Sequence, residues 1–133
     1  WKKCATMHDA PSTAELVEAV KRFVDDTAAP QLTGHAAFHA RVASNVLATI
    51  LRELEQRPAA EADEKARLID LLDADPGTPL DTLNRLLCER IQAGSMNLST
   101  DGLLEHLKTT TIAQLSVDQP RYSGLALALQ SRG

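Results

Sequence analysis

Two histidines four residues apart, His35 and His39, have the spacing that most directly suggests chemistry. In a helix this spacing places both imidazoles on one face, where they can hold a metal ion if a third ligand comes from elsewhere. The candidate third ligands are His8, Glu15 and Asp118. A ligand-binding or catalytic histidine is a second interpretation. We favour a third, in which a histidine is buried or half-buried and hydrogen-bonded to a backbone carbonyl, or the two form a neutral pair at the end of a bundle, so no cofactor is expected.

A second polar group lies on the same expected helix. Arg41 and Asn45 are one turn apart and can contact the same partner, and Arg52 lies farther along their edge. Such donors suit a carboxylate or a phosphate, whereas a structural ion pair is the simpler alternative. Residues 118–122, Asp-Gln-Pro-Arg-Tyr, form another segment dense in donors and acceptors.

These two polar regions are expected to meet. An imidazole on an apolar helix face needs a hydrogen-bond partner, because its desolvation is otherwise uncompensated. We therefore expect residues 118–122 to dock near the start of the second helix, with Asp118 pairing with His39 or Arg41 and Tyr122 packing on that helix. No catalytic residue is predicted, and the candidate ligand-binding residues are His39, Arg41, Asn45, Asp118, Arg121 and Tyr122.

Helical patterns cover most of the chain and predict an all-α fold, a compact bundle of five to six helices. A capping box at Ser12 and Glu15 starts the first helix, and Pro58 is expected to end the second, residues 34–56. A weaker third helix should cover residues 59–73. A fourth should start at the Thr78 cap and end before Gly94, and a fifth should follow Ser99 or Thr100, with bending at residues 109–111. Residues 122–130 suit a short last helix or a strand.

The second helix is expected to be the most buried. Its apolar residues, from Phe38 and Val42 on one side to Leu47 and Leu51 on the other, cover more than half of its circumference. Helices of that kind are usually central and packed on two sides.

Composition narrows the function classes. The 133 residues carry a net charge of −4 and only four aromatic side chains, which disfavours nucleic acid as a partner. No apolar run approaches the ~18 residues of a membrane span. Two distant cysteines suit free thiols in the cytoplasm. Residues 1–6 are expected to be an upstream remnant before a natural start at Met7, and residues 7–133 a single helical domain.

Several segments resemble a family of short all-helical bacterial proteins of unknown function. The more specific ones are Phe-His-Ala-Arg-Val-Ala at 38–43 with Asn45, and Val-Asp-Gln-Pro-Arg-Tyr at 117–122. The resemblance covers nearly all of residues 7–133. It implies a helical cytosolic protein whose gene often neighbours those of an acyl-CoA dehydrogenase and a kinase resembling aminoglycoside phosphotransferases. The apolar tail after Ser123 departs from the more basic segment of that family, which puts the orientation of the tail in doubt.

Two functions are consistent with these features. The favoured one is an accessory or interaction protein for a neighbouring acyl-CoA-handling enzyme or kinase, because none of the common enzyme motifs is present. The alternative is a small-molecule- or metal-binding helical domain built on His39, Arg41, Asn45 and the Asp118–Tyr122 loop. The first helix, the weak third helix and the apolar tail carry more Leu and Val than one small bundle needs to cover, which also predicts a symmetric homodimer.

Overall fold

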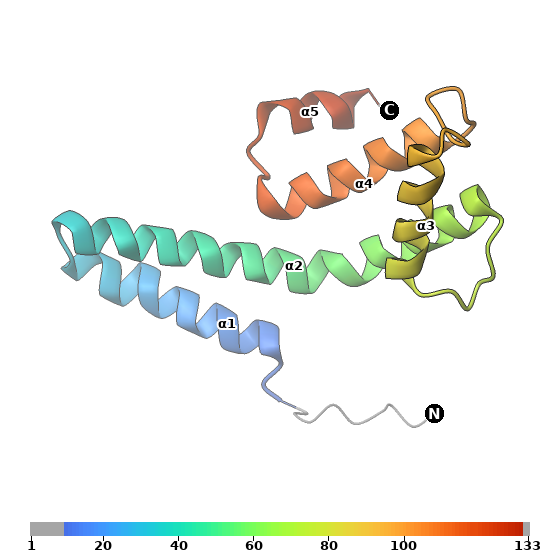
Figure 1. Cartoon of the computed structure of the whole chain (residues 1–133). Coiled ribbons are helices and arrows are strands. Elements are labelled where there is room, and N and C mark those ends of the chain that lie inside the picture. The colour runs from blue at the N-terminus through green and yellow to red at the C-terminus, as the bar shows by residue number, and fades with distance from the viewer. Residues whose placement is uncertain (1–9, 132–133) are drawn as a thin grey trace. The chain divides into compact units, whose positions relative to one another are not determined.

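The computed structural model describes residues 10–131, which form five α-helices and two short helical segments (Figure 1). The elements in chain order are α1 (Thr13–Arg22), the π-helix η1 (Phe23–Ala28), the 3-10 helix η2 (Ala29–Gln31), α2 (Gly34–Leu72), α3 (Leu80–Gln92), α4 (Leu103–Asp118) and α5 (Ser123–Gln130). No strand occurs in this part of the chain, so the all-α prediction is confirmed. None of the described helices combines the length and apolar character needed to cross a bilayer.

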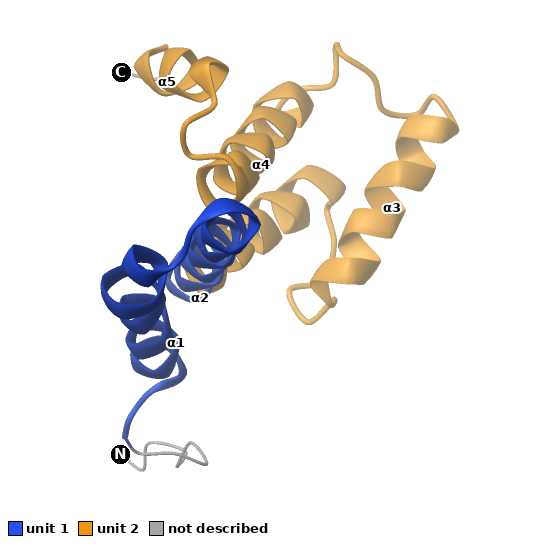
Figure 2. Ribbon diagram, turned by 90° about the vertical axis from the view of Figure 1, so that its left-hand side faces the viewer, with its two compact units in different colours: residues 1–55 blue, residues 56–133 orange. Residues whose placement is uncertain are grey.

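The chain divides into two compact units, Trp1–Glu55 and Gln56–Gly133, here called unit 1 and unit 2 (Figure 2). Helix α2 contributes to both of them. The expectation of a single domain over residues 7–133 stays a prediction.

Unit 1 is a helical hairpin in which α1 lies beside the first part of α2 (Figures 1 and 2). The predicted capping box is present: the Ser12 N–H donates to Glu15 Oε2 at 2.6 Å, and the Glu15 N–H donates to Ser12 Oγ at 3.2 Å. The helix does not stop at Arg22 but widens into η1, where the Ala29 N–H donates to the carbonyl of Val24, five residues earlier. These local bonds set where the helical segments of the first arm begin and end. No side chain of this arm is buried.

The prediction that Pro58 ends a helix is wrong, because α2 continues through it to Leu72. Proline removes one backbone hydrogen bond, here to the carbonyl of Leu54, at a cost of about 3 kcal/mol. Strong helix formers lie on both sides, including Glu55, Gln56, Ala59 and Ala60. An ion pair between Arg57 Nε and Glu61 Oε1 at 3.1 Å spans the proline. The expected third helix is therefore the second half of α2.

The prediction that residues 34–56 form the most buried helix is also wrong for the isolated chain. Within residues 10–55 no side chain is buried, and Phe38, Val42, Val46 and Ile50 are 39–53 % exposed. The apolar pattern identified side chains that favour burial. Burial itself depends on whether another element covers them.

The hydrophobic core lies entirely in unit 2. Its buried members come from the end of α2, from α3, from the connection after α3 and from the start of α4: Leu68, Leu72, Leu83, Leu87, Met96 and Leu103. Leu125 of α5 is buried as well. These residues are four or fewer positions apart within α2 and α3, so each of the two helices presents one face to the core.

The ends of the later helices differ in detail from those expected. α3 begins at Leu80 with Pro79 as N-cap and no capping side chain, whereas Gly94 does adopt the expected left-handed conformation after it, with φ of 75°. α4 begins only at Leu103, because Thr100 closes a preceding turn in which its hydroxyl accepts from the Asn97 N–H at 2.9 Å. Residues 109–111 stay helical, and the tail forms the helix α5.

The buried leucines of unit 2 should contribute most to the free energy of unfolding. Leu68 is 0 % exposed, so Leu68→Ala should leave a cavity and lower the free energy of unfolding by about 2–5 kcal/mol. Leu98 is 79 % exposed, and Leu98→Ala should change it by less than about 0.5 kcal/mol. Urea titration followed by circular dichroism measures both, and equal losses would show that the core is placed elsewhere.

Candidate functional site

His35 and His39 lie at the start of α2, in unit 1. Their ring centroids are 6.4 Å apart with an interplanar angle of 27°, and Phe38 contacts His39 edge-on with centroids 5.6 Å apart. The expected shared face is therefore present. The interpretation of a buried or half-buried histidine is wrong, because both imidazoles are exposed, and water can satisfy His39 without a partner from the chain.

The described residues contain no group of three or more side chains suited to holding a metal ion. Glu15, one expected third ligand, is engaged in the capping box, and its hydrogen bonds with the Ser12 backbone and hydroxyl lower the pKa of its carboxyl group. Asp118 belongs to unit 2, and His8 lies outside the described residues.

The expected arginine edge is exposed along α2. Arg41 and Asn45 are one turn apart and both face solvent, as the spacing predicts. Farther along, Arg52 Nη2 donates to Thr49 Oγ1 at 2.9 Å, and that hydroxyl donates to the Asn45 carbonyl at 3.1 Å. A local hydrogen-bond chain thus occupies part of this edge. An anion site there stays a prediction.

The segment 118–122 connects α4 to α5 in unit 2. Asp118 is the last residue of α4 and Tyr122 the N-cap of α5, and the Tyr122 N–H donates to the Gln119 carbonyl at 2.9 Å. Asp118, Arg121 and Tyr122 are all exposed, Tyr122 by 52 %. His39 and Arg41 belong to the other unit, so the docking of this segment on the start of α2 stays a prediction.

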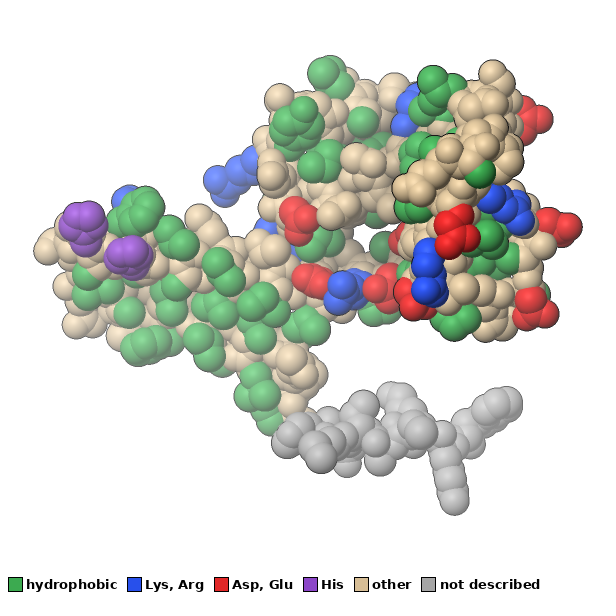
Figure 3. All heavy atoms as spheres, in the orientation of Figure 1, with side chains coloured by type: hydrophobic (Ala, Val, Ile, Leu, Met, Phe, Trp, Pro, Cys, Tyr) green, Lys and Arg blue, Asp and Glu red, His purple; other side chains and the backbone are tan. Residues whose placement is uncertain are grey.

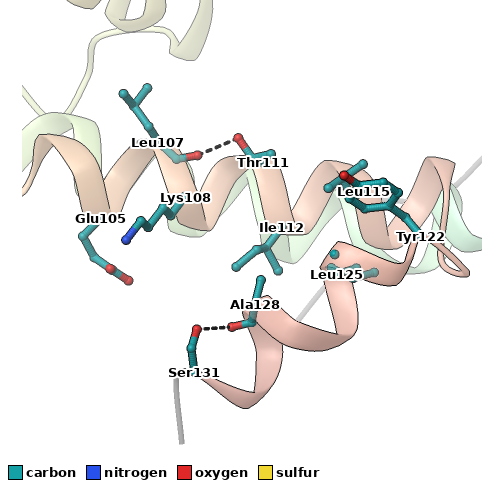
Figure 4. Close-up of a pocket in the computed structure, with 11 residues that line it drawn as sticks. Glu105, Leu107, Lys108, Thr111, Ile112, Leu115, Tyr122, Leu125, Ala128 and Ser131 are labelled. Atoms are coloured by element: carbon teal, nitrogen blue, oxygen red, sulfur yellow. Dashed lines mark hydrogen bonds between the residues drawn. The ribbon is translucent and has the colours of Figure 1, made fainter.

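A groove of about 420 Å³ lies between α4 and α5 (Figure 4). Ile112 and Leu115 of α4 and Leu125 and Ala128 of α5 supply its apolar lining, Glu105 and Lys108 lie at one end, and Tyr122 lies at the other. The groove exists because α4 is apolar on two sides: one side packs in the core, and the short α5 covers the other incompletely. Of the six predicted ligand-binding residues, only Tyr122 lines it.

A polar cluster in unit 2, which consists of the buried His106 and half-buried neighbours, was not predicted from the sequence. His106 of α4 is 3 % exposed, and its Nδ1 has no hydrogen-bond partner. Nε of Arg67 on α2 is also a buried atom without a hydrogen-bond partner. Arg67 Nη2 donates to Thr110 Oγ1 at 3.2 Å. Asn84 Nδ2 donates to Glu64 Oε1 at 2.9 Å.

The signal for this cluster was present in the sequence. Leu103, His106 and Thr110 follow at three- and four-residue steps, which places the two polar residues on the core side of α4. The apolar residues that follow Leu103 and His106, Leu104 and Leu107, are exposed instead. The cluster joins α2 to α4 through polar contacts rather than exposing a reactive group.

Burial sets the protonation of His106. Desolvation lowers the pKa of its imidazole below the ordinary 6.5, and the positive charge of Arg67 lowers the pKa further, while the Glu64 carboxylate opposes both. The imidazole is therefore neutral in the folded protein at pH 7. A neutral imidazole beside an arginine avoids placing two positive charges in the core.

This assignment predicts a pH dependence of stability. Below pH of about 6.5 the unfolded chain binds a proton at His106 that the folded chain does not, so the free energy of unfolding falls as the pH falls. His106→Leu should remove that contribution, making the loss between pH 8 and pH 5 smaller than in the wild type; His106→Gln serves as a polar second variant. Urea titrations at both pH values measure the difference. An identical loss in all three proteins would contradict the assignment.

Comparison with known families gives a match to a domain without an assigned role. Residues 30–122 match the family described as Domain of unknown function (DUF6285), a span that includes α2, the other core helices and the 118–122 segment but not α1 or η1. No curated protein and no solved structure matches the chain. Because the match covers more than half of its length, the chain belongs to the DUF6285 family.

Proposed function

We propose that this protein is an interaction protein rather than an enzyme, and that unit 1 completes its packing against another protein chain. One observation carries the proposal: residues 10–55 contain no buried side chain. Helices of this length owe most of their stability to packing of an apolar face, and two helices alone supply only one contact between such faces. A hairpin without a core of its own is the expected state of a surface that is covered in its complex.

The uncovered side chains form two rows, here called the apolar stripes of unit 1. They are Leu16, Val20 and Phe23 on the first arm, and Phe38, Val42, Val46, Ile50 and Leu54 on α2, each 39–60 % exposed. Figure 3 shows hydrophobic side chains gathered over both arms, on a face nearly free of charged ones. Exposed apolar surface of this extent typically marks a protein-interaction site.

The charged side chains of α1 support this assignment. Lys21 pairs with Asp25, and Arg22 pairs with Glu18 at 3.0 Å, so these charges are matched within their own arm. The pKa of the Asp25 carboxyl group is lowered, first by the hydrogen bond from Lys21 and second by a hydrogen bond with Ser44 of α2. Because these charges are already paired, the apolar stripes are the part of unit 1 that a partner chain would stabilise most by covering it.

The proposal also names the kind of enzyme that the protein binds. The gene neighbourhood implied by the family resemblance suggests that the protein serves a bacterial acyl-CoA dehydrogenase or a phosphotransferase-like kinase. A cytoplasmic location agrees with that role and with Cys88, a free and exposed thiol.

A direct test mixes the purified protein with each purified enzyme and follows sedimentation velocity. We expect a complex with one of them, and we expect Val20→Glu/Val46→Glu to lose every association of the chain, because each carboxylate would be buried unpaired. Leu98→Glu, at an exposed position of unit 2, is the matched control and should behave like the wild type. A double variant that associates as the wild type does would refute the proposal.

A second candidate function, small-molecule binding, is favoured by the groove between α4 and α5. Its volume of about 420 Å³ lies within the range of ligand pockets, and its apolar lining suits an amphipathic molecule whose polar group lies at the end formed by Lys108 and Glu105. Tyr122 is the predicted residue that it includes. The Tyr122 ring lies over Gly124, where a Cβ would come within 2.6 Å of Tyr122 Cε1.

The fluorescent anion 8-anilinonaphthalene-1-sulfonate tests this candidate. In the Val20→Glu/Val46→Glu background, which removes the competing apolar stripes, the probe should still bind. Ala128→Phe should fill the groove and abolish the fluorescence, whereas Leu127→Ala, outside the lining, should not change it. Equal fluorescence in the two variants would exclude the groove as the site.

A further inference from the structure

The α2 stripe has the form of a surface that can pack against itself, and we infer that a second copy of this chain covers it. The inference rests on the proposed function, because it names the chain that completes unit 1. In the resulting dimer, α2 of one copy crosses α2 of the other through the row Phe38, Val42, Val46, Ile50 and Leu54. A partner enzyme binds this dimer and not the single copy, so a variant that cannot dimerise loses the enzyme as well.

The spacing of the row carries the argument. Its five residues follow one another at intervals of four, so their side chains form one continuous ridge inclined to the axis of α2. Ridges of this kind interdigitate when two helices cross at about −50°, the commonest packing class in globular proteins. Two identical surfaces, each with its ridge lying in the groove beside the ridge of the other, satisfy the two-fold symmetry of an isologous dimer.

The size of the surface fits such a dimer. The eight side chains of the two stripes are each about half exposed. At roughly 80 Å² of uncovered area per side chain they offer roughly 600 Å² per copy, close to the ~800 Å² per partner of a standard interface. With the neighbouring α1 arms, two hairpins form a four-helix arrangement with apolar rows inside.

Charge favours a second copy over a lipid or nucleic acid surface. Residues 10–55 hold four Lys and Arg and six Asp and Glu, a net charge of −2, and the ridge itself holds none. An acidic hairpin is repelled by anionic headgroups and by phosphates, which basic side chains recognise. The ridge itself is uncharged, so only apolar side chains meet where it contacts a second copy.

The experiment is a charge exchange at Val46, the middle residue of the ridge, which lies at the two-fold axis and meets Val46 of the second copy. Sedimentation velocity at high micromolar concentration should find the wild type dimeric. Val46→Glu and Val46→Lys should each be monomeric, because like charges would oppose one another at the axis. An equimolar mixture of the two should restore a dimer, and Leu98→Glu should stay dimeric.

Circular dichroism confirms that each variant is folded. A monomeric wild type overturns the inference, and so do single variants that remain dimeric, since the contact must then lie elsewhere. Two monomeric variants that do not re-associate overturn the pairing of Val46 with itself. The proposed function is judged separately: it survives a monomeric wild type if the enzyme complex forms and is lost in Val20→Glu/Val46→Glu, and it fails if that variant still binds.

Discussion

The leucine cluster of unit 2 is the interaction on which the described structure depends. Leu68 and Leu72 from α2 meet Leu83 and Leu87 from α3, and Leu103 brings α4 to the same core. Burial of these side chains supplies the main favourable term that holds the three helices together, because most of the fully buried apolar side chains of the described residues lie here. The rest of unit 2 extends this core, whereas unit 1 has no core of its own.

Helix α4 shows how one apolar helix creates both a core contact and a groove. One side carries Leu103 and His106 into the core, and the other carries Ile112 and Leu115 under α5. A helix of eight residues is too short to cover that second side fully, so space remains between them. The buried His106 and the neighbouring half-buried Arg67 place polar side chains at the joint between α2 and α4, with the imidazole held neutral.

Unit 1 follows the same physical rule with the opposite outcome. Its helices carry apolar stripes as regular as those of unit 2, yet no element of residues 10–55 covers them. Local bonds, such as the capping box at Ser12, set the helix ends but contribute far less than a core. A protein with one packed unit and one uncovered hairpin is organised for assembly, which links the fold to the proposed role.

The sequence by itself determined what depends on neighbours along the chain: the all-α class, the capping box at Ser12, the left-handed Gly94 and the shared face of His35 and His39. Tertiary structure decided what depends on distant residues. It carried α2 through Pro58, buried His106 and left Val46 exposed. Periodicity reveals which side chains favour burial, but burial requires a covering element, and the covering element for Leu68 is made by α3 and α4, far along the chain. Of the predicted ligand-binding residues, Tyr122 alone lines a groove, because α5 packs on α4 in a way that no local pattern encodes.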